Sequence, residues 1–580
     1  MKCDEKTSAR FERALSSLEP LWRAAYDEGV CRDAALSELT LKDCILEVVS
    51  RRYDEPHIVY RGREISYAES NEAACRLANA LVSRGCGKGD AVCIMLGDIP
   101  ELIIAFAACY KIGCVAVGVN PRSTCDEVAR FMVDSGAHVL VLPEVLAGLV
   151  PADLAERGVE VRLAVAVGND AGTKVRVEGA AQAGFCDSAP AFGGELAAWE
   201  ELLASSHAEE PRVLVAPDDV AMLIYTGGTT GVSKGCPLTN RMLVWSQKCF
   251  FGFMRPLLRD ARNMTSLLTS PMTHAYGMNF GINWGLVIGG TVVLAEALDG
   301  ASLSRLIAEH RVTVWGAVPV LLNELSTYIE RSGIELPSLS TVVVSCAATS
   351  SEVMRRFKAS CSAARVVEDY GMTETSGPVT LTPMAKGASE GSVGVPVPDT
   401  DVLVVDFETA RNPVPVGERG EVVFRGPQVI TEYWHAPQES EDAFVGEWIR
   451  SGDVGYFDEL GCLHVVDRIK DVIMVGGFSV FPREIDEVMH THPAVIDSCT
   501  IGVFDERSGE RPKSFVVVAD GARVTEHALV EHCRERLIAY KCPKHVEFVD
   551  AIPLTAMGKP DKKELRRREE QRRASQPDCA

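Results

Sequence analysis

Residues 225–240 read YTGGTTGVSKGCPLTN and follow the apolar run Val220–Ile224, which has the composition of a buried strand. The stretch combines four glycines with threonine and serine hydroxyls, and Lys234 is its one cation. Glycine lets a backbone turn tightly and bring its N–H groups close to a bound anion, and hydroxyls add further donors. We therefore interpret this stretch as a phosphate-binding loop that follows a strand.

The loop does not fit the Walker A pattern, G-x-x-x-x-G-K-[ST]. Ser233 precedes Lys234 and Gly235 follows it, so the required Gly-Lys-Ser/Thr is absent. A surface loop between two core elements is the structural alternative. The dense ordering of glycines and hydroxyls directly after a strand favours phosphate binding.

Composition limits the partners of the chain. The 580 residues carry a net charge of −22. Such a chain repels nucleic acid and anionic lipid outside local patches, so we expect no nucleic acid partner and at most peripheral membrane contact. A phosphate site must then rely on local donors. Oligomeric state is left open between monomer and homodimer.

Cysteine usage and the N-terminus indicate a cytoplasmic protein. The 19 cysteines are scattered, odd in number and without a C-x-x-C pair, so we expect most of them to be buried free thiols. The first residues mix acids and bases and lack the apolar core of a signal peptide. The apolar runs Leu102–Val119 and Ala275–Ala295 contain Lys111 or five glycines, and we assign them to a globular core rather than to a membrane.

The pattern of elements predicts an α/β fold. Helices such as Cys125–Ser135 alternate with short apolar strands such as His138–Leu142, which is typical of parallel sheets. After Gly391 the sequence pattern changes to predicted strands separated by glycine turns, which is typical of a small antiparallel, β-barrel-like subdomain. A small α+β unit follows from about Arg468.

Five further stretches have the chemistry of a nucleotide site, although each alone also fits an ordinary turn or surface ion pair. They are DYGMTET (369–375), SGDVG (451–455), DRIKD (467–471), GGFSVFPRE (476–484) and PLTAMGKPDKKELR (553–566). A tyrosine at a strand end can stack on a base, and a carboxylate beside phosphates suits Mg²⁺. A buried aspartate can accept the two hydroxyls of a ribose. We expect the cations that follow Lys559, from Lys562 to Arg568, to form a solvated helix face.

The order of these motifs resembles that of the adenylate-forming superfamily of acyl-CoA synthetases, adenylation domains and luciferases. The resemblance covers about Leu41 to Arg568. Within the superfamily, the sequence is most similar to those of fatty acyl-CoA synthetases. It implies a large N-terminal adenylation domain over residues 1–467. It also implies a small mobile C-terminal domain over residues 468–580, with a hinge near Lys470.

The resemblance implies roles for individual residues. Those implied in ATP binding are Thr226, Gly227, Gly228, Thr229, Thr230, Gly231, Lys234, Tyr370, Gly371, Asp453 and Arg468. The implied catalytic residues are Lys559, Thr373, Glu374 and His274, with Glu374 and more weakly Thr230 as ligands of Mg²⁺. Coenzyme A would pass Gly476, Gly477 and Phe478, and the acyl pocket would include Tyr276, Gly277, Cys346 and Ala347.

The implied activity is ATP-dependent joining of a carboxylic acid to coenzyme A through an acyl adenylate, with Mg²⁺ as cofactor. A medium- or long-chain fatty acid is the expected substrate. The alternatives are an aryl or steroid-type acid, or transfer of the acyl group to a carrier protein. The sequence departs from the family pattern at two positions. Gly228 replaces the commoner serine of the phosphate loop. Cys346 replaces a common glycine, which narrows the expected acyl pocket and bears on the size of the acid. Trp284 and Trp315 are further candidates to shape that pocket.

Overall fold

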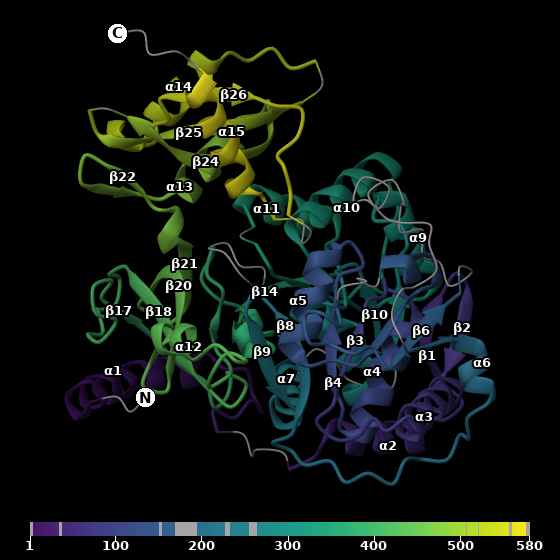
Figure 1. The fold of residues 1–580 in the computed structure, drawn as a ribbon. Coiled ribbons are helices and arrows are strands. Elements are labelled where there is room, and N and C mark those ends of the chain that lie inside the picture. Colours follow the sequence, from purple (N-terminus) through teal and green to yellow (C-terminus); the bar gives the residue numbers. More distant parts are fainter. Residues whose placement is uncertain are drawn as a thin grey trace.

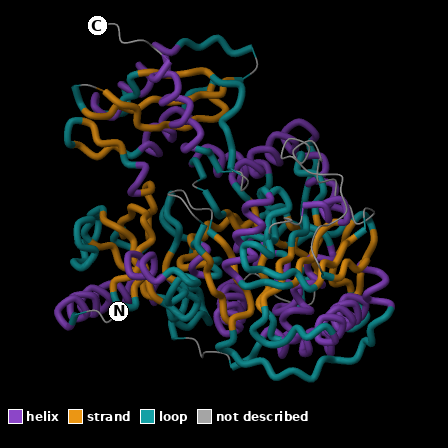
Figure 2. Tube along the Cα trace, in the orientation of Figure 1, coloured by secondary structure: helices purple, strands orange, loops and turns teal. Residues whose placement is uncertain are grey.

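The computed structural model describes residues 4–33, 38–149, 154–168, 194–226, 233–254, 264–347, 349–505, 507–519, 521–555 and 559–575 (Figure 1). Within these residues the strands form four sheets, two large and mainly parallel and two small and mainly antiparallel. Figure 2 shows the strands of the large sheets flanked by helices. The predicted α/β class is confirmed.

The first large sheet contains seven strands in the described residues. Its order is β7 (Glu195–Ala198), β6 (Leu163–Val167), β5 (Val139–Pro143), β3 (Ala91–Ile94), β4 (Val115–Gly118), β8 (Val220–Tyr225) and β9 (Gly235–Thr239). Only the β8–β9 pair is antiparallel. Its connecting helices are α3 (Tyr67–Ser83), α4 (Pro100–Ile112), α5 (Cys125–Ser135) and α6 (Trp199–Ala204).

The second large sheet contains nine strands in the described residues. Its order is β16 (Val395–Pro396), β15 (Pro378–Leu381), β14 (Arg365–Gly371), β13 (Thr341–Val344), β12 (Val314–Ala317), β10 (Thr265–Leu268), β11 (Thr291–Leu294), β1 (Pro56–Tyr60) and β2 (Arg63–Ser66). The six strands from β14 to β1 are parallel. Its helices are α2 (Leu41–Arg52), α7 (Asn240–Met254), α8 (Ala275–Phe280), α9 (Gly300–Glu309), α10 (Pro319–Ser332) and α11 (Ser351–Ser360).

The two apolar runs considered for membrane spans are core segments. Every residue of α4 except Glu101 is buried, because the helix is covered by packed layers on all sides. The second run forms α8 and a π-helical turn, Trp284–Ile288, both buried. None of the helices in the described ranges is long and apolar enough to cross a membrane.

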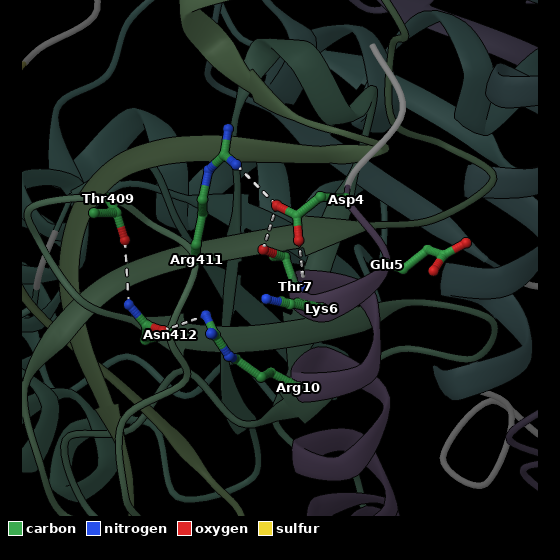
Figure 3. Close-up of a pocket in the computed structure, with 8 residues that line it drawn as sticks. All are labelled: Asp4, Glu5, Lys6, Thr7, Arg10, Thr409, Arg411 and Asn412. Carbon is green, nitrogen blue, oxygen red and sulfur yellow. Dashed lines mark hydrogen bonds and ion pairs between the residues drawn. The ribbon is translucent and has the colours of Figure 1, made fainter.

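A small antiparallel sheet lies beside the large sheets and is covered by the N-terminal helix α1 (Glu5–Ala25). Its strands are β17 (Asp401–Val405), β18 (Gly420–Arg425), β19 (Phe444–Val445), β20 (Trp448–Phe457) and β21 (Leu463–Arg468), with α12 (Pro437–Ala443) between β18 and β19. Phe11 and Trp22 of α1 pack on aromatic rings of β20. At its start α1 is capped by Asp4, which also pairs with Arg411 at 3.0 Å (Figure 3).

The C-terminal residues form their own sheet, drawn at the top of Figure 1. Its strands are β22 (Ile473–Val475), β23 (Phe478–Val480), β24 (Val495–Asp505), β25 (Gly509–Val518) and β26 (His545–Phe548). Helices α13 (Pro482–His490), α14 (Glu526–Arg534) and α15 (Lys562–Ser575) accompany them. The division of the chain at residues 467 and 468 stays a prediction.

Three sequence-based expectations were wrong in detail. The stretch 225–240 is not a loop throughout, because residues 235–239 form a second strand, β9, that pairs with β8. Trp315 packs with Phe357 and donates to Thr269, whereas its neighbour Gly316 faces Phe280, because successive strand residues point to opposite faces. Trp315 therefore lies on the face of the sheet away from the acyl pocket residues. Arg566 of α15 pairs with Asp471 at 2.7 Å, so the C-terminal cations are not all solvated.

Thirteen of the sixteen cysteines in the described residues are buried and none of the sixteen is bonded to another, as expected.

Candidate active site

The β8–β9 hairpin closes the phosphate loop at its base. The N–H of Thr226 donates to the carbonyl of Lys234 at 2.9 Å, and the N–H of Lys234 donates to Thr226 Oγ1 at 3.3 Å. These bonds hold the two ends of the loop together. The candidate residues Gly227, Gly228, Thr229, Thr230 and Gly231 lie outside the described residues.

The Lys234 ammonium and the Glu374 carboxylate meet across one aromatic ring. Lys234 Nζ lies 4.1 Å from the ring centroid of Tyr433, and the Tyr433 hydroxyl donates to Glu374 Oε1 at 2.7 Å. Burial raises the pKa of Glu374, while the Tyr433 hydrogen bond opposes that rise. A cation over an aromatic face contributes about 0.5–2 kcal/mol. The ring therefore positions both charged groups.

The backbone of residues 430–434 fixes this arrangement. The N–H of Ile430 donates to the Glu374 carbonyl at 2.9 Å, and the N–H of Trp434 donates to the Gly235 carbonyl at 2.8 Å. Tyr433 thus lies between the loop and the DYGMTET motif. Sequence reasoning assigned it no role, although the segment RGPQVITEYWHAPQ that contains it carries part of the family resemblance.

Tyr370, Asp453 and Arg468 form a second group. The Tyr370 hydroxyl donates to Asp453 Oδ2 at 2.6 Å, and Arg468 Nε donates to Asp453 Oδ1 at 2.8 Å. Asp453 and Arg468 are cross-strand partners in the β20–β21 pair, so the sheet register sets their contact. Burial raises the pKa of Asp453, and the Arg468 charge opposes the rise.

Thr373 and Glu374 begin the short 3₁₀ turn Thr373–Thr375, which follows Gly371 at the exposed end of β14. This turn orients Glu374 inward toward Tyr433 while Thr373 remains half-buried. Two neighbouring side chains of one motif therefore face different parts of the site.

Lys559 enters the same site from the C-terminal unit. Burial lowers the pKa of Lys559. The charges of Cys346 and Asp453 raise this pKa, and the charge of Arg468 lowers it. Burial also lowers the pKa of His274 to about 4, with the positive charge of Lys559 as the second cause. Because such charge effects fall off with distance, Lys559 lies near these groups. The fold thus brings together residues that lie more than two hundred positions apart in the chain.

The predicted acyl pocket residues cluster at the carboxyl ends of β12 and β13. His274 Nδ1 accepts from the N–H of Tyr276 at 3.3 Å and so caps α8. The Tyr276 hydroxyl donates to the Val343 carbonyl at 2.7 Å. A side chain at Gly277 would place Cβ 2.1 Å from the Pro271 carbonyl oxygen, so only glycine fits there.

Cys346 follows β13 with a φ of 71°, a conformation that side chains other than glycine rarely adopt. Its side chain is half-buried and Ala347 beside it is exposed, and the predicted narrowing of the acyl pocket stays a prediction. Strained backbone of this kind is concentrated at ligand sites. The glycine that the family pattern has here would adopt this φ at lower cost.

The predicted coenzyme A residues are not in this group. Gly476 and Gly477 form a tight turn with φ of 57° and 89°, and Phe478 stacks on Tyr540 with ring centroids 4.9 Å apart. Phe478 remains 59% exposed. The turn joins β22 to β23 at the edge of the C-terminal sheet, drawn at the left of that unit in Figure 1.

The donor set fits Mg²⁺. Glu374 supplies one buried carboxylate beside the phosphate loop, and the described residues contain no group of three His, Cys, Asp or Glu side chains that could hold a metal alone. Mg²⁺ commonly takes one or two protein carboxylates and completes its shell with substrate phosphates and water. Such an ion would therefore be held by Glu374 together with the nucleotide.

Comparison with protein families gives a match over most of the chain. The AMP-binding enzyme model matches residues 46–434, and the AMP-binding enzyme C-terminal domain matches residues 484–559. The chain belongs to the AMP-binding enzyme family. The two matches include the phosphate loop, Glu374, Tyr433 and Lys559, whereas Asp453 and Arg468 lie in the interval between them.

Among curated relatives of this AMP-binding enzyme, a feruloyl-CoA synthase from Amycolatopsis sp. is 34% identical over 525 residues, covering 90% of this chain and 98% of the relative. A long-chain-fatty-acid–CoA ligase from Bacillus subtilis (strain 168) is 28% identical over 561 residues, covering 94% and 97%. The crystal structure of ATP-bound MatB from Rhodopseudomonas palustris superposes with a TM-score of 0.79 at 27% identity, covering 91% of this chain and 99% of that one.

Proposed function

We propose that this AMP-binding enzyme activates a carboxylic acid with ATP and transfers the acyl group to coenzyme A. The acid–CoA ligase activity follows from the family and from two kinds of relative, one named for long-chain fatty acids and one named a feruloyl-CoA synthase. The observation that carries the site assignment is the position of Lys559. It comes from the C-terminal unit, the charges of Asp453, Arg468 and Cys346 act on it, and its own charge acts on His274.

The chain's own residues support the first half-reaction. A carboxylate is ionised at pH 7, so its attack on the α-phosphorus needs no general base. It does need compensation for two approaching anions, and we assign this to Lys559, Lys234 and the loop donors. His274 is neutral at pH 7 because burial lowers its pKa to about 4, so it contributes shape and a ring N–H rather than charge.

The nucleotide roles follow the geometry of the two groups. Tyr370 would stack on the adenine, while Asp453 and Arg468 would bind the ribose hydroxyls. Tyr433 would hold Glu374 in place, and Thr373 would donate to the α-phosphate. When bound, Mg²⁺ would be held by Glu374, with Thr230 as a weaker candidate, and would neutralise phosphate charge.

The second half-reaction requires a rearrangement. The thiol of coenzyme A, with a pKa of about 8.5 by analogy with cysteine, attacks the activated carbonyl and AMP leaves. We infer that Gly476, Gly477 and Phe478 reach the acyl group only after the C-terminal domain, residues 468–580, rotates about Lys470. We infer that the present arrangement, in which the charge of Lys559 acts on His274, is the one for adenylate formation.

A medium- or long-chain fatty acid is one proposed substrate, supported by the Bacillus subtilis relative. An aryl acid is the second, supported by the feruloyl-CoA synthase relative and by the aromatic rings around Tyr276 and Phe280. Phe280 lies against Gly316, where a Cβ would be 2.7 Å from the ring. A ring there fills space that an extended alkyl chain would need.

The test is a product assay on purified protein with ATP, Mg²⁺ and a panel of fatty and aryl acids. AMP and acyl-CoA are expected for at least one acid when coenzyme A is present. Turnover only with a phosphopantetheinylated carrier would move the acceptor assignment to a carrier protein. No pyrophosphate release with any acid would overturn the proposal.

A further inference from the structure

Three amide side chains lie together next to the acyl pocket residues. Gln247 of α7 donates through Nε2 to Asn279 Oδ1 at 2.7 Å, and Asn283 donates through Nδ2 to the same oxygen at 3.4 Å. Gln247 is 1% exposed and Asn283 is fully buried. Asn283 also directly precedes the π-helical turn, a rare element that is frequent at functional sites.

The hydrogen bonds fix the orientation of every amide in this cluster. Asn279 Nδ2 donates to the Ser376 carbonyl at 2.8 Å, and a carbonyl can only accept. The Asn279 oxygen must therefore face Gln247 and Asn283, which must present their NH₂ groups to it. Rotating any one amide by 180° would bring two acceptors together.

This orientation leaves two buried acceptors without donors. In the described part of the chain, Gln247 Oε1 and Asn283 Oδ1 have no hydrogen-bond partner. Leaving a buried acceptor unsatisfied costs about 1–3 kcal/mol. Two such oxygens in one fixed cluster indicate a place where a ligand supplies the donor.

A continuous aromatic wall connects the amide cluster to the acyl pocket. Phe250 lies three residues after Gln247 on α7, hence on the same helix face, and packs edge-on against Phe280 at 5.5 Å. Phe280 in turn packs against Tyr276 at 5.0 Å. Through these ring contacts the cluster is connected to Tyr276, one of the predicted acyl pocket residues.

We propose that Gln247 and Asn283 are specificity-determining residues that accept a hydrogen bond from a hydroxyl group, and that the substrate is a hydroxylated aromatic carboxylic acid. This inference rests on the proposed function, because it concerns the acid that the same site activates. Two acceptors favour a neutral donor and repel a second carboxylate. The rings of Phe250, Phe280 and Tyr276 favour an aromatic body, since aromatic pairs prefer edge-to-face packing.

The test compares kcat/KM for 3-phenylpropanoic acid with kcat/KM for each of its ring-hydroxylated derivatives, which are positional isomers of one another. The native enzyme is expected to prefer at least one isomer by about a hundredfold or more, since a site built to bind a hydroxyl rejects the analogue without it. Gln247→Met keeps the shape and removes the acceptor, and is expected to reduce the preference to about tenfold or less. The KM for ATP should not change.

Gln428→Met is the matched control, because Gln428 is equally buried but its amide group is paired at both ends, with Pro378 and Thr400. It should alter stability without altering the hydroxyl preference. Asn283→Leu provides a second variant if Gln247→Met does not fold. The inference would be overturned if the native enzyme had, for every isomer, a kcat/KM no higher than that for the unhydroxylated acid. The two oxygens would then bind only water. That result would leave the proposed function intact as long as the unhydroxylated acid is activated.

Discussion

At the scale of single residues, the site depends on groups whose environments set their charge. Glu374 and Asp453 are both buried, and burial raises the pKa of each. Neighbouring donors oppose that rise and favour the ionised form, Tyr433 for Glu374, and Arg468 with Tyr370 for Asp453. The neighbours are therefore as necessary to the site as the carboxylates.

Lys559→Ala is expected to lower the rate of adenylate formation by about a hundredfold or more, since removing one donor to a developing charge typically costs 10²–10³. Thioester formation from supplied acyl-AMP should be largely retained. The two half-reactions are measured separately, by pyrophosphate release and by acyl-CoA formation. Lys563→Ala, which changes an exposed lysine of α15, is the control. Equal losses in both half-reactions would contradict the assignment.

Tyr433→Phe removes the hydroxyl that donates to Glu374 while keeping the ring under Lys234. The hydrogen bond stabilises the ionised carboxylate, so its loss should raise the pKa of Glu374 further. Activity that requires the ionised form is lost as pH falls through that pKa. The acidic limb of the kcat/KM profile should therefore move to higher pH, and an unchanged limb would show that Tyr433 does not act through Glu374.

At the scale of elements, helix α1 holds the small antiparallel sheet that carries Asp453 and Arg468. Trp22 is fully buried against Phe457, and the Arg32 guanidinium lies 5.4 Å from the Trp22 ring centroid. The helix is also anchored at its start by the Asp4 cap and the Arg411 pair (Figure 3). These contacts join the N-terminal helix to the small antiparallel sheet and its loops.

Trp22→Ala should lower the free energy of unfolding by about 3–5 kcal/mol, the usual cost of removing a large buried ring. Because the helix does not contact the reacting groups, kcat at low temperature should change little. Chemical denaturation and thermal inactivation measure the two effects. Ser17→Ala, at an exposed position of the same helix, should stay within about 0.5 kcal/mol of the native protein. A stability loss below about 1 kcal/mol would count against α1 as a structural anchor.

At the scale of the whole molecule, the proposed mechanism needs two arrangements of the C-terminal unit. Arg566 and Lys562 of α15 contact Asp471 beside the proposed hinge, at 2.7 and 3.9 Å. Lys562 also lies 3.8 Å from Asp467 across the proposed hinge, and a rotation about Lys470 would change that contact. A rotation about Lys470 must change the backbone angles of a short 3₁₀ turn, Ile469–Asp471.

Lys470→Pro should separate the two half-reactions in the opposite sense to Lys559→Ala. Proline fixes φ near −65°, so the hinge cannot adopt a second backbone conformation that needs another φ. Adenylate formation should persist, while thioester formation should fall by about a hundredfold, as expected when reacting groups are misplaced. Lys470→Ala is the control that removes the side chain and keeps the backbone free. Full thioester formation in Lys470→Pro would place the hinge elsewhere.

Much of the fold could be predicted from the sequence because its signals are local. Strand and helix periodicity depends on neighbouring residues, and it gave the parallel sheets and the helix Cys125–Ser135 with its bounds. The strand β9 was missed because its sequence, GCPLT, has no alternation and directly precedes a helix. Trp315 was misplaced because the sequence does not say which face of β12 each residue takes.

From the sequence alone, the glycine and hydroxyl pattern indicated a phosphate loop, and the order of the motifs, through its resemblance to the adenylate-forming superfamily, implied that the protein activates an acid. How these segments act together follows from the tertiary structure. Tyr433, the amide cluster and the closeness of Lys559 to Asp453 depend on contacts between segments far apart in the chain. Packing and burial create these contacts, and they leave no local pattern in the sequence.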